Sequence, residues 1–369
     1  MRAAVLHQQN QPIVVEDNVD IIQPRAGEVR VNVAYCGLCH SDLSVISGVM
    51  GAIEQPIIVG HEAAGVIESV GAGVTHLAVG DHVVLTPVPP CGVCYYCQRG
   101  DMSLCTNGHS IMTNRLPDGT TGLSHNGNEV LRGVGVAALA EQVICPASGA
   151  IKIDPTIPLD VACVMGCAIQ TGVGAVLNTA NVETGATVLV LGLGAIGLAT
   201  VQGAKMAGAT TIIASDPLAD RREKALGFGA TVVLDPTDTD VIAKTMELTQ
   251  GIGVDYTFET AGIAALIEQG IAASRAGGTT VCVGAPSIEQ GVSIDNVVIF
   301  ASMSKKLCGC MLGSCNSAAD IPRFLRAYQA GDLDLPSMVT NIRPLSEINE
   351  AFEDLLHGKG IRTVIDMNA

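Results

Sequence analysis

A short apolar run that leads into three spaced glycines constrains the fold of this chain most strongly. The run TVLVL precedes Gly192, Gly194 and Gly197, and a helix is expected over residues 195–207. A G-x-G-x-x-G motif is informative only in this setting, between a strand and a helix. Gly192 would permit the tight turn, Gly194 would let a pyrophosphate approach the backbone near Ile196, and Gly197 would let the helix contact the strand. The motif therefore predicts a dinucleotide-binding fold.

The residues around this motif extend the prediction. Strand and helix patterns alternate over residues 187–284, as in a doubly wound parallel α/β sheet. Asp216 ends the next strand, TTIIASD, about 20 residues after the motif, where a carboxylate can accept hydrogen bonds from the adenosine ribose and repel a 2′-phosphate. We therefore expect NAD in preference to NADP. A glycine-rich turn with Asp216 as a helix cap is the alternative.

Four cysteines lie close together in the run CGVCYYCQRGDMSLC: Cys91, Cys94, Cys97 and Cys105. Zn²⁺ binds four thiolates tetrahedrally, and short spacers let a single loop surround the ion. Reduced loop cysteines or two disulfides are the alternatives. Because four thiolates leave no position for water, we expect a structural zinc site and place any catalytic metal elsewhere.

Three further candidate ligands stand in separate motifs: Cys39 in GLCHSD, His61 in GHEAAG and Cys167 in MGCAIQTG. Each motif alone is as readily explained by an interior cysteine or histidine. Together they offer a Cys₂His set that leaves the fourth zinc position open for water or substrate. An open zinc ion beside a nicotinamide can bind an alcohol oxygen and lower its pKa before hydride leaves for the cofactor. We therefore expect a zinc-dependent oxidoreductase.

The length of 369 residues favours two domains. Short β-branched runs between glycine and proline turns predict a mostly antiparallel β domain up to about residue 150. Two amphipathic helices and a last strand, after Asp320, are expected to fold back onto it. We expect a catalytic zinc-binding β domain over residues 1–168 and 312–369, and an NAD-binding Rossmann domain over residues 169–311.

Composition excludes several classes of partner. The net charge of −16 and the lack of a basic stripe argue against nucleic acid. The uncharged stretch 161–181 contains glycines and amides, and the stretch 186–201 is broken by Gly192, Gly194 and Gly197, so we expect neither to span a membrane. The N-terminus lacks the pattern of a signal peptide, and the 13 cysteines are an odd number. We therefore expect a cytoplasmic protein with reduced thiols.

Six motifs stand in a familiar order: GLCHSD, GHEAAG, the four-cysteine loop, MGCAIQTG, GLGAIG and GIRTVI. Their order resembles that of zinc-dependent medium-chain alcohol dehydrogenases over nearly the whole chain, and the segment after Cys105 is similar to that of the longer, typically dimeric branch. The resemblance implies a Rossmann sheet with a GroES-like β domain, NAD, two Zn²⁺ ions per subunit and a homodimer. It also implies that Glu62 lies close behind the catalytic zinc as an outer or transient ligand.

The resemblance also implies roles for single residues. Ser41 would hydrogen-bond the substrate oxygen and pass its proton toward the nicotinamide ribose. Ser44 stands where many members have a histidine, and a serine cannot act as a base near neutral pH, so the relay would end in water or in another group. The implied NAD contacts are His40 and Arg362 at the pyrophosphate, Thr171 near the nicotinamide and Arg221 by the adenosine ribose. Solvated positions are the alternative for His40 and Arg362.

The substrate and the subunit interface are predicted from a few positions. Pro87, Val134 and Ala285 would line a channel with room for a bulky or aromatic primary alcohol or aldehyde. The run NVVIFASMSKKLCGCML could form an edge strand that pairs with its copy across a two-fold axis.

Three alternatives stay open. A thiol-adduct formaldehyde dehydrogenase loses support, because Met50 and His109 stand where such members use a carboxylate and an arginine. A nicotinoprotein would keep NAD bound and use an external acceptor. A non-catalytic scaffold would be expected to lack a catalytic zinc ligand, and Cys39, His61 and Cys167 are all present.

Overall fold

The computed structural model describes residues 1–49, 51–54 and 56–369. The chain forms two compact units. The first unit comprises Met1–Ala168, Asn316–Tyr328 and Leu335–Ala369, and the second comprises Ile169–Cys315 and Gln329–Asp334. Met50, which was weighed against the thiol-adduct alternative, lies outside the described residues.

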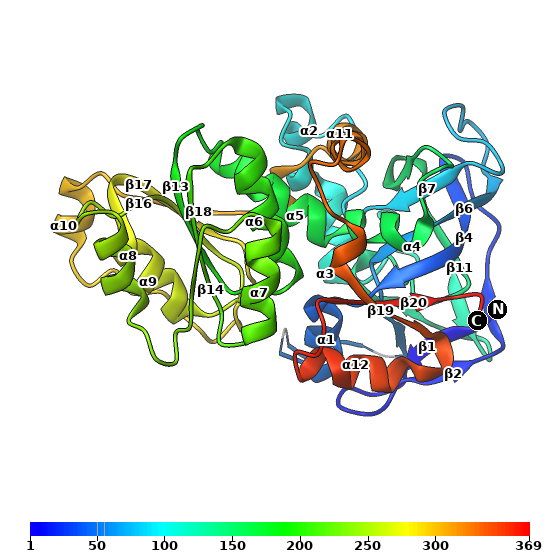
Figure 1. The fold of residues 1–369 in the computed structure, drawn as a ribbon. Coiled ribbons are helices and arrows are strands. Elements are labelled where there is room, and N and C mark those ends of the chain that lie inside the picture. Colours follow the sequence, from blue (N-terminus) through cyan, green and yellow to red (C-terminus); the bar gives the residue numbers. More distant parts are fainter. Residues whose placement is uncertain (50, 55) are drawn as a thin grey trace. The chain divides into compact units, whose positions relative to one another are not determined.

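The second unit is built on a six-stranded parallel sheet in the order β15-β14-β13-β16-β17-β18. Helices α6 and α7 lie on one face of it and α8 and α9 on the other (Figure 1). This is the strand order of a doubly wound dinucleotide-binding sheet, which confirms the predicted Rossmann fold. The bounds are β13 (Thr187–Leu191), β14 (Thr211–Ser215), β15 (Val232–Leu234), β16 (Val254–Glu259), β17 (Ser274–Cys282), β18 (Lys306–Gly309), α6 (Ala195–Ala207), α7 (Ala219–Phe228), α8 (Val241–Leu248), α9 (Ala264–Ala273) and α10 (Val297–Ser302).

The central strands of this sheet are apolar because helices cover both faces. Leu189, Leu191 and Ile213 are buried in one cluster with Val254. The strand order reverses between β13 and β16, and ligands of such sheets bind outside the carboxyl ends of the strands at that point. Helix α6 begins in the glycine motif, over the residues predicted for it.

The run predicted as an edge strand is only partly a strand. Its first half is α10, because the Asn296 side chain accepts a hydrogen bond from the backbone N–H of Ile299 and so caps a helix. Its second half is β18, which does lie at the edge of the sheet. The strand is therefore shorter than predicted.

The first unit contains a mostly antiparallel sheet in the order β12-β7-β6-β4-β20-β19, with β11 also paired to β4. The last strand, β20, pairs antiparallel with β4, next to the start of α1. This confirms the predicted antiparallel β architecture. The strands are β4 (Glu28–Gly37), β6 (Glu62–Val70), β7 (His82–Leu85), β11 (Gln142–Pro146), β12 (Ala150–Lys152), β19 (Val339–Pro344) and β20 (Arg362–Asp366).

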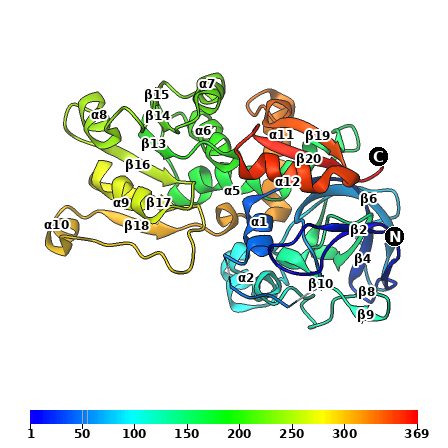
Figure 2. The same cartoon turned by 90° about the horizontal axis from the view of Figure 1, so that it is seen from below.

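Two smaller sheets complete the first unit (Figure 2). The order β10-β5-β1-β2 joins β1 (Ala3–Leu6), β2 (Val14–Glu16), β5 (Ile57–Ile58) and β10 (Leu131–Arg132). The order β3-β8-β9 joins β3 (Val19–Ile21), β8 (Leu123–His125) and β9 (Asn128–Glu129). The helices of this unit are α1 (His40–Ser47), α2 (Tyr95–Arg99), α3 (Ser110–Thr113), α4 (Leu159–Ala162), α11 (Ser317–Ala330) and α12 (Ile348–Leu356), and α5 (Ala168–Gly174) begins at its boundary.

Within the described residues, no single helix is long and apolar enough to cross a membrane. One consecutive helix pair, Leu159–Gly166 and Ala168–Ala180, passes that test only when taken together, and it is bent at the break between them.

Candidate zinc and dinucleotide sites

Cys39, His61 and Cys167 converge in the first unit. Their ligand atoms lie within 4.8 Å of one another, and all three side chains are buried. Cys39 directly precedes α1, His61 directly precedes β6, and Cys167 follows the 3₁₀ turn Cys163–Gly166. The pairing of β4 with β6 brings the first two motifs together, since Gly37 lies opposite Glu62. The structure thus assembles the Cys₂His set that the sequence predicted.

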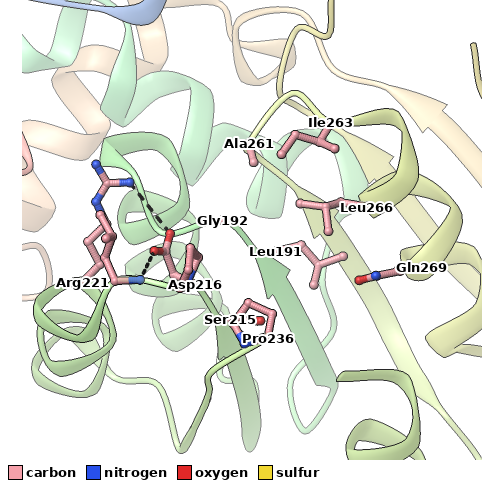
Figure 3. A pocket seen from close by; sticks show the side chains of 12 residues that line it. Leu191, Gly192, Ser215, Asp216, Arg221, Pro236, Ala261, Ile263, Leu266 and Gln269 are labelled. Atoms are coloured by element: carbon pink, nitrogen blue, oxygen red, sulfur yellow. Dashed lines mark hydrogen bonds and ion pairs between the residues drawn. The ribbon is translucent and has the colours of Figure 1, made fainter. Parts of the chain in front are cut away.

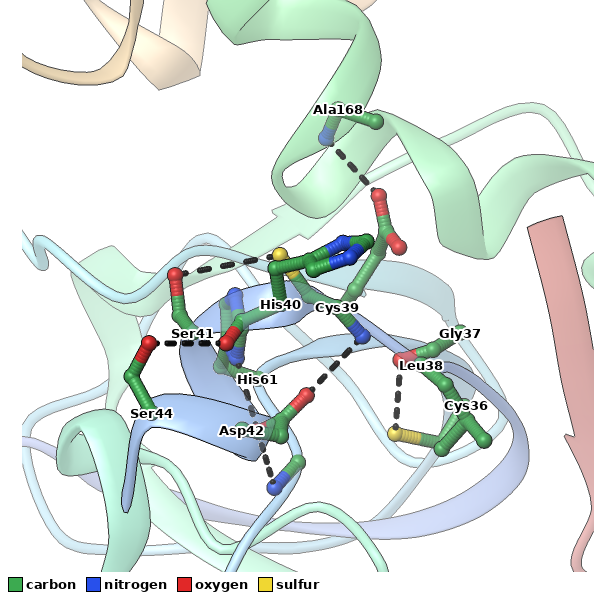
Figure 4. Close-up of polar contacts among 12 residues, drawn as sticks. Cys36, Gly37, Leu38, Cys39, His40, Ser41, Asp42, Ser44, His61 and Ala168 are labelled. Carbon is green, nitrogen blue, oxygen red and sulfur yellow. Dashed lines mark hydrogen bonds and ion pairs between the residues drawn. The ribbon is translucent and has the colours of Figure 1, made fainter. Parts of the chain in front are cut away.

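Asp42 stabilises this cluster through contacts with His61 and with the backbone beside it (Figure 4). Its fully buried carboxylate lies 3.1 Å from His61 Nδ1, and it accepts hydrogen bonds from the backbone N–H groups of Gly60 at 2.8 Å and Cys39 at 3.1 Å. A carboxylate at one ring nitrogen fixes the imidazole so that the other nitrogen can bind a metal. Asp42 was not predicted from the sequence, although its place three residues after Cys39 is that of a capping-box acid at the start of a helix.

The charges of the cluster fit a divalent cation. A hydrogen bond from Cys167 holds the pKa of Cys39 well below that of a free thiol, and the same bond raises the pKa of Cys167. Burial lowers the pKa of His61, but the charge and the hydrogen bond of Asp42, together with the contact to Cys39, outweigh burial, so that the pKa is raised. A buried thiolate is costly unless it is paired or coordinates a metal. The donor set and its burial therefore match a zinc site.

Glu62 adjoins this cluster and is fully buried. Its Oε1 accepts a hydrogen bond from the backbone N–H of Ala168 at 2.8 Å, and Arg362 Nε lies 3.0 Å from its Oε2. Burial raises the pKa of Glu62 to about 7. Arg362, which is only 3% exposed, also donates to the Leu38 carbonyl. The structure thus places Arg362 against Glu62, and its contact with a pyrophosphate stays a prediction.

Ser41 and Ser44, the residues predicted for a proton relay, both lie in α1. Ser41 is exposed, and its Oγ lies 3.8 Å from Cys39 Sγ. The Ser44 hydroxyl donates a hydrogen bond to the backbone carbonyl of His40 at 3.0 Å (Figure 4). His40 itself is exposed at the start of the helix. The hydroxyl at position 44 is therefore engaged within its own helix.

The four cysteines of the loop also converge. The four sulfurs lie within 4.8 Å of one another, and Cys94 Sγ is 3.9 Å from Cys105 Sγ. Four sulfurs about 2.3 Å from a tetrahedral zinc ion would be about 3.8 Å apart. Backbone N–H groups point at the sulfurs, for example Cys94 N–H toward Cys91 at 3.3 Å and Cys97 N–H toward Cys94 at 3.5 Å. All cysteines are free thiols, so the disulfide alternative finds no support.

The glycine motif has the geometry that a bound pyrophosphate needs. Gly192 has a φ of +89°, which favours glycine, and a Cβ on Gly197 would lie 2.0 Å from the Gly192 carbonyl oxygen. A Cβ on Gly194 would meet no atom within 4 Å. Gly194 is the N-cap of α6, so open space lies at a helix N-terminus, where anions bind. Ile196 is half-buried in the first turn of this helix.

A cavity of about 230 Å³ lies beside Asp216 (Figure 3). Asp216 accepts hydrogen bonds from the backbone N–H groups of Leu193 at 2.7 Å and Leu218 at 2.9 Å, and Arg221 Nη1 is 3.8 Å from its Oδ2. Apolar side chains form the other side of the cavity, among them Pro236, Ile263 and Leu266. The cavity therefore offers an apolar slot for a flat base next to a carboxylate. Asp216 and Arg221 were predicted from the sequence, but the apolar side was not, because its residues follow separate strands.

The remaining predicted positions are dispersed. Thr171 is buried in α5 of the second unit. Pro87 and Val134 are buried in the first unit, whereas Ala285 is exposed in the second. His109 is exposed at the end of the 3₁₀ turn Thr106–His109. The lining of a substrate channel by Pro87, Val134 and Ala285 stays a prediction.

Two protein families match separate parts of this chain. Residues 25–155 match the alcohol dehydrogenase GroES-like domain, and residues 195–330 match the zinc-binding dehydrogenase family. An NDMA-dependent alcohol dehydrogenase of Amycolatopsis methanolica is 38% identical over 99% of this chain and 98% of its own. A probable S-(hydroxymethyl)glutathione dehydrogenase 1 of Schizosaccharomyces pombe is 35% identical over 100% of this chain and 97% of its own.

A solved structure adds a third relative. Benzyl alcohol dehydrogenase of Acinetobacter calcoaceticus is 30% identical, with a TM-score of 0.93 over 99% of this chain and 98% of its own. The two family matches and the relatives that span almost the whole chain confirm the resemblance, the two-domain fold, and NAD and zinc as cofactors. The chain therefore belongs to the zinc-dependent medium-chain alcohol dehydrogenases, and it is an NAD-dependent alcohol oxidoreductase.

Proposed function

We propose that this enzyme interconverts a bulky primary alcohol, aromatic alcohols included, and its aldehyde, with hydride passing to and from NAD. The observation that carries the alcohol chemistry is the convergence of Cys39, His61 and Cys167, three buried side chains with ligand atoms within 4.8 Å of one another. The size of the substrate rests on the small apolar residues predicted for its channel, Pro87, Val134 and Ala285. These residues would hold the catalytic zinc, and the loop cysteines Cys91, Cys94, Cys97 and Cys105 would hold the structural one. Zinc bound at the first site supplies a Lewis acid for the alcohol oxygen.

The side chains around the cluster have separable tasks in this proposal. Asp42 holds the His61 ring by its Nδ1 atom, so that Nε2 faces the ion. The exposed hydroxyl of Ser41, next to Cys39, accepts the proton of the substrate alcohol. Because Ser44 donates to the His40 carbonyl and carries no base, the proton then passes to water. Glu62, buried against Arg362, would be an outer or transient ligand.

The second unit would bind NAD through its glycine motif and cavity. The open space at Gly194 would take the pyrophosphate, and the cavity beside Asp216 would take the adenosine. The Asp216 carboxylate would repel a 2′-phosphate, which favours NAD over NADP. Arg221, 3.8 Å from Asp216, would stand beside the ribose, while His40, Thr171 and Arg362 are proposed contacts for the rest of the dinucleotide.

A substrate panel with the purified enzyme tests the substrate class. Zinc content is measured first, and turnover with NAD is then compared for ethanol, benzyl alcohol, a terpenoid alcohol, and formaldehyde mixed with glutathione. We expect two zinc ions per chain and the highest kcat/KM with benzyl or terpenoid alcohols. Faster turnover of ethanol would contradict the proposed pocket. Preference for the formaldehyde and glutathione mixture would favour the thiol-adduct chemistry named for the Schizosaccharomyces pombe relative.

A second candidate is a nicotinoprotein that keeps NAD bound and transfers hydride to an external acceptor. The 38% identity to an NDMA-dependent alcohol dehydrogenase favours it. Extensive dialysis followed by addition of benzyl alcohol distinguishes the two. The absorbance of reduced nicotinamide appears in the dialysed protein only if NAD stays bound, whereas a freely exchanging enzyme needs added NAD.

We also propose a homodimer formed through the edge of the Rossmann sheet. Strand β18 lies at that edge, and nearby apolar side chains are exposed, among them Val297 at 65% and Val298 at 77%. A second copy would cover these side chains and pair the free strand edge. Sizing with light scattering should give twice the chain mass, and a monomer would contradict the proposal. The free thiols agree with a cytoplasmic location, which fractionation of cells would test.

A further inference from the structure

A third cluster of metal-ligating side chains lies apart from both zinc sites. His7, Glu16 and His125 bring their ligand atoms within 4.8 Å of one another. One carboxylate lies between two imidazoles: Glu16 Oε1 is 2.9 Å from His7 Nε2, and Glu16 Oε2 is 3.6 Å from His125 Nε2. The proposed alcohol chemistry uses none of these residues.

The three residues come from two different sheets. His7 directly follows β1 and Glu16 ends β2, both in the four-stranded sheet, whereas His125 ends β8 in the three-stranded sheet. Their side chains are 44%, 24% and 10% exposed, respectively. The cluster is therefore anchored on the side of His125 and open to water on the side of His7. An ion could enter without any movement of the backbone.

We propose that His7, Glu16 and His125 bind a divalent ion of the zinc class. Donor atoms about 2.0–2.1 Å from a tetrahedral zinc ion would be about 3.3 Å apart, and the two separations of 2.9 and 3.6 Å lie on either side of this value. Two imidazoles and one carboxylate suit zinc, cobalt, nickel or copper, whereas calcium and magnesium prefer oxygen ligands. The net charge of −16 also favours a cation over an anion.

Hydrogen bonds from His125 to neighbouring amides are the alternative explanation for the closeness of the three residues. The Oδ1 atom of Asn18 lies 2.9 Å from His125 Nε2, and Asn126 Nδ2 lies 3.2 Å from the same nitrogen. Together with the Glu16 carboxylate, these contacts to His125 would form a polar network that needs no ion. In the metal-bound form, His125 would carry its ring proton on Nδ1, so that Nε2 could bind the ion, and the side-chain oxygen of Asn18 would be near enough to serve as a fourth ligand. The ion would link the two sheets.

Zinc binding to untagged holoenzyme tests the proposal. Wild type, His7→Gln, Glu16→Gln and His357→Gln are each equilibrated by dialysis against micromolar free zinc and analysed for metal. His357 is the matched control, because its Nδ1 lies 3.5 Å from Glu353 Oε2 but this pair belongs to no cluster of three ligating groups among the described residues. We expect three zinc ions per chain in wild type and His357→Gln, and two in the other variants.

Thermal unfolding and turnover give the second readout. Added zinc should raise the melting temperature of wild type and of His357→Gln, because an ion that binds only the folded state stabilises it, and this rise should be absent in His7→Gln. His7 is 44% exposed, so its replacement should leave folding and alcohol turnover unchanged. The proposal is overturned if wild type saturates at two zinc ions, or if the third ion persists in His7→Gln.

Discussion

The Oδ1 atom of Asp42 lies 3.1 Å from Nδ1 of His61, and both side chains are buried. The Asp42 carboxylate orients the His61 ring and accepts two backbone hydrogen bonds. Asp42→Asn keeps the size of this side chain but removes its negative charge. Loss of such an outer partner typically costs about 10–100-fold in metal affinity or activity. We therefore expect kcat/KM for the alcohol to fall by about that factor and zinc to be lost more readily to a chelator.

Asp81→Asn is the matched control for this variant. Asp81 forms an ion pair with Lys152 at 2.6 Å and belongs to none of the ligand clusters among the described residues. The same substitution there should leave zinc content and turnover unchanged. Full zinc retention and full activity in Asp42→Asn would show that Asp42 only supports the fold.

Alanine substitution at two glycines of the dinucleotide motif should affect two different properties, the stability of the fold and the affinity for NAD. In Gly197→Ala, the new methyl group would lie 2.0 Å from the Gly192 carbonyl oxygen, so the turn must distort and stability should fall by about 1–3 kcal/mol. In Gly194→Ala, the methyl group meets no protein atom within 4 Å, so stability should be preserved. The methyl group would instead occupy the space proposed for the pyrophosphate, and NAD affinity should fall. Urea unfolding and titration with NAD separate the two effects; unchanged NAD affinity in Gly194→Ala would contradict the proposed binding mode.

Ser41 and Ser44 of α1 should differ in how strongly turnover depends on their hydroxyl groups. Ser41→Ala removes the hydroxyl proposed to take the substrate proton, and a positioned proton acceptor typically contributes about 10²–10⁴-fold to the rate. Ser44→Ala removes only a hydrogen bond to the His40 carbonyl, so its turnover should stay close to wild type. Position 44 should add no step near pH 6.5, the ordinary pKa of a histidine, to the wild-type pH–rate profile, because no imidazole stands there. A large loss of turnover in Ser44→Ala would show that the Ser44 hydroxyl takes part in proton transfer.

Much of the fold could be predicted because its signals are local. Helix α6 and strand β13 follow from a glycine motif and an apolar run that are continuous in sequence. The ligands Cys39, His61 and Cys167 lie far apart in sequence, yet each stands in its own short motif. Their convergence was therefore predicted from motif order, and the structure supplies the distances.

Contacts that depend on register could not be predicted in this way. Arg362 is buried beside Glu62 because β20 pairs with β4, and no local pattern shows which side of β20 its side chain takes. The cluster of His7, Glu16 and His125 joins two sheets, and no motif marks it. The predicted edge strand was too long, because a short run of apolar residues fits a helix as well as a strand. The Asn296 cap, which marks the start of α10, was not taken into account.

The ion pair of Arg30 and Glu68 should make stability depend on pH. Arg30 Nε and Nη2 lie 2.6 and 2.8 Å from the two Glu68 oxygens, and these hydrogen bonds lower the pKa of Glu68 from 4.5 to about 2. A carboxylate with a lowered pKa stabilises the fold above its unfolded pKa, and this contribution is lost as the pH falls from about 4.5 to about 2. Since 31% of the Glu68 side chain is exposed, solvent screening limits the pair to about 1 kcal/mol.

Urea unfolding of wild type and Glu68→Gln at pH 7 and pH 3 checks this value. Glu68→Gln should be less stable by about 1 kcal/mol at pH 7, and the difference should shrink at pH 3, because Glu68 of the unfolded wild-type chain is then mostly protonated and must lose its proton on folding. Comparing the two proteins at each pH cancels the loss of zinc in acid, which affects both. Glu54→Gln is the control, because its side chain is 84% exposed and lies 3.7 Å from Arg115, so it should match wild type at both pH values. A stability difference between Glu68→Gln and wild type that is equally large at pH 7 and pH 3 would mean that packing of the side chain, and not its charge, stabilises the pairing of β4 and β6.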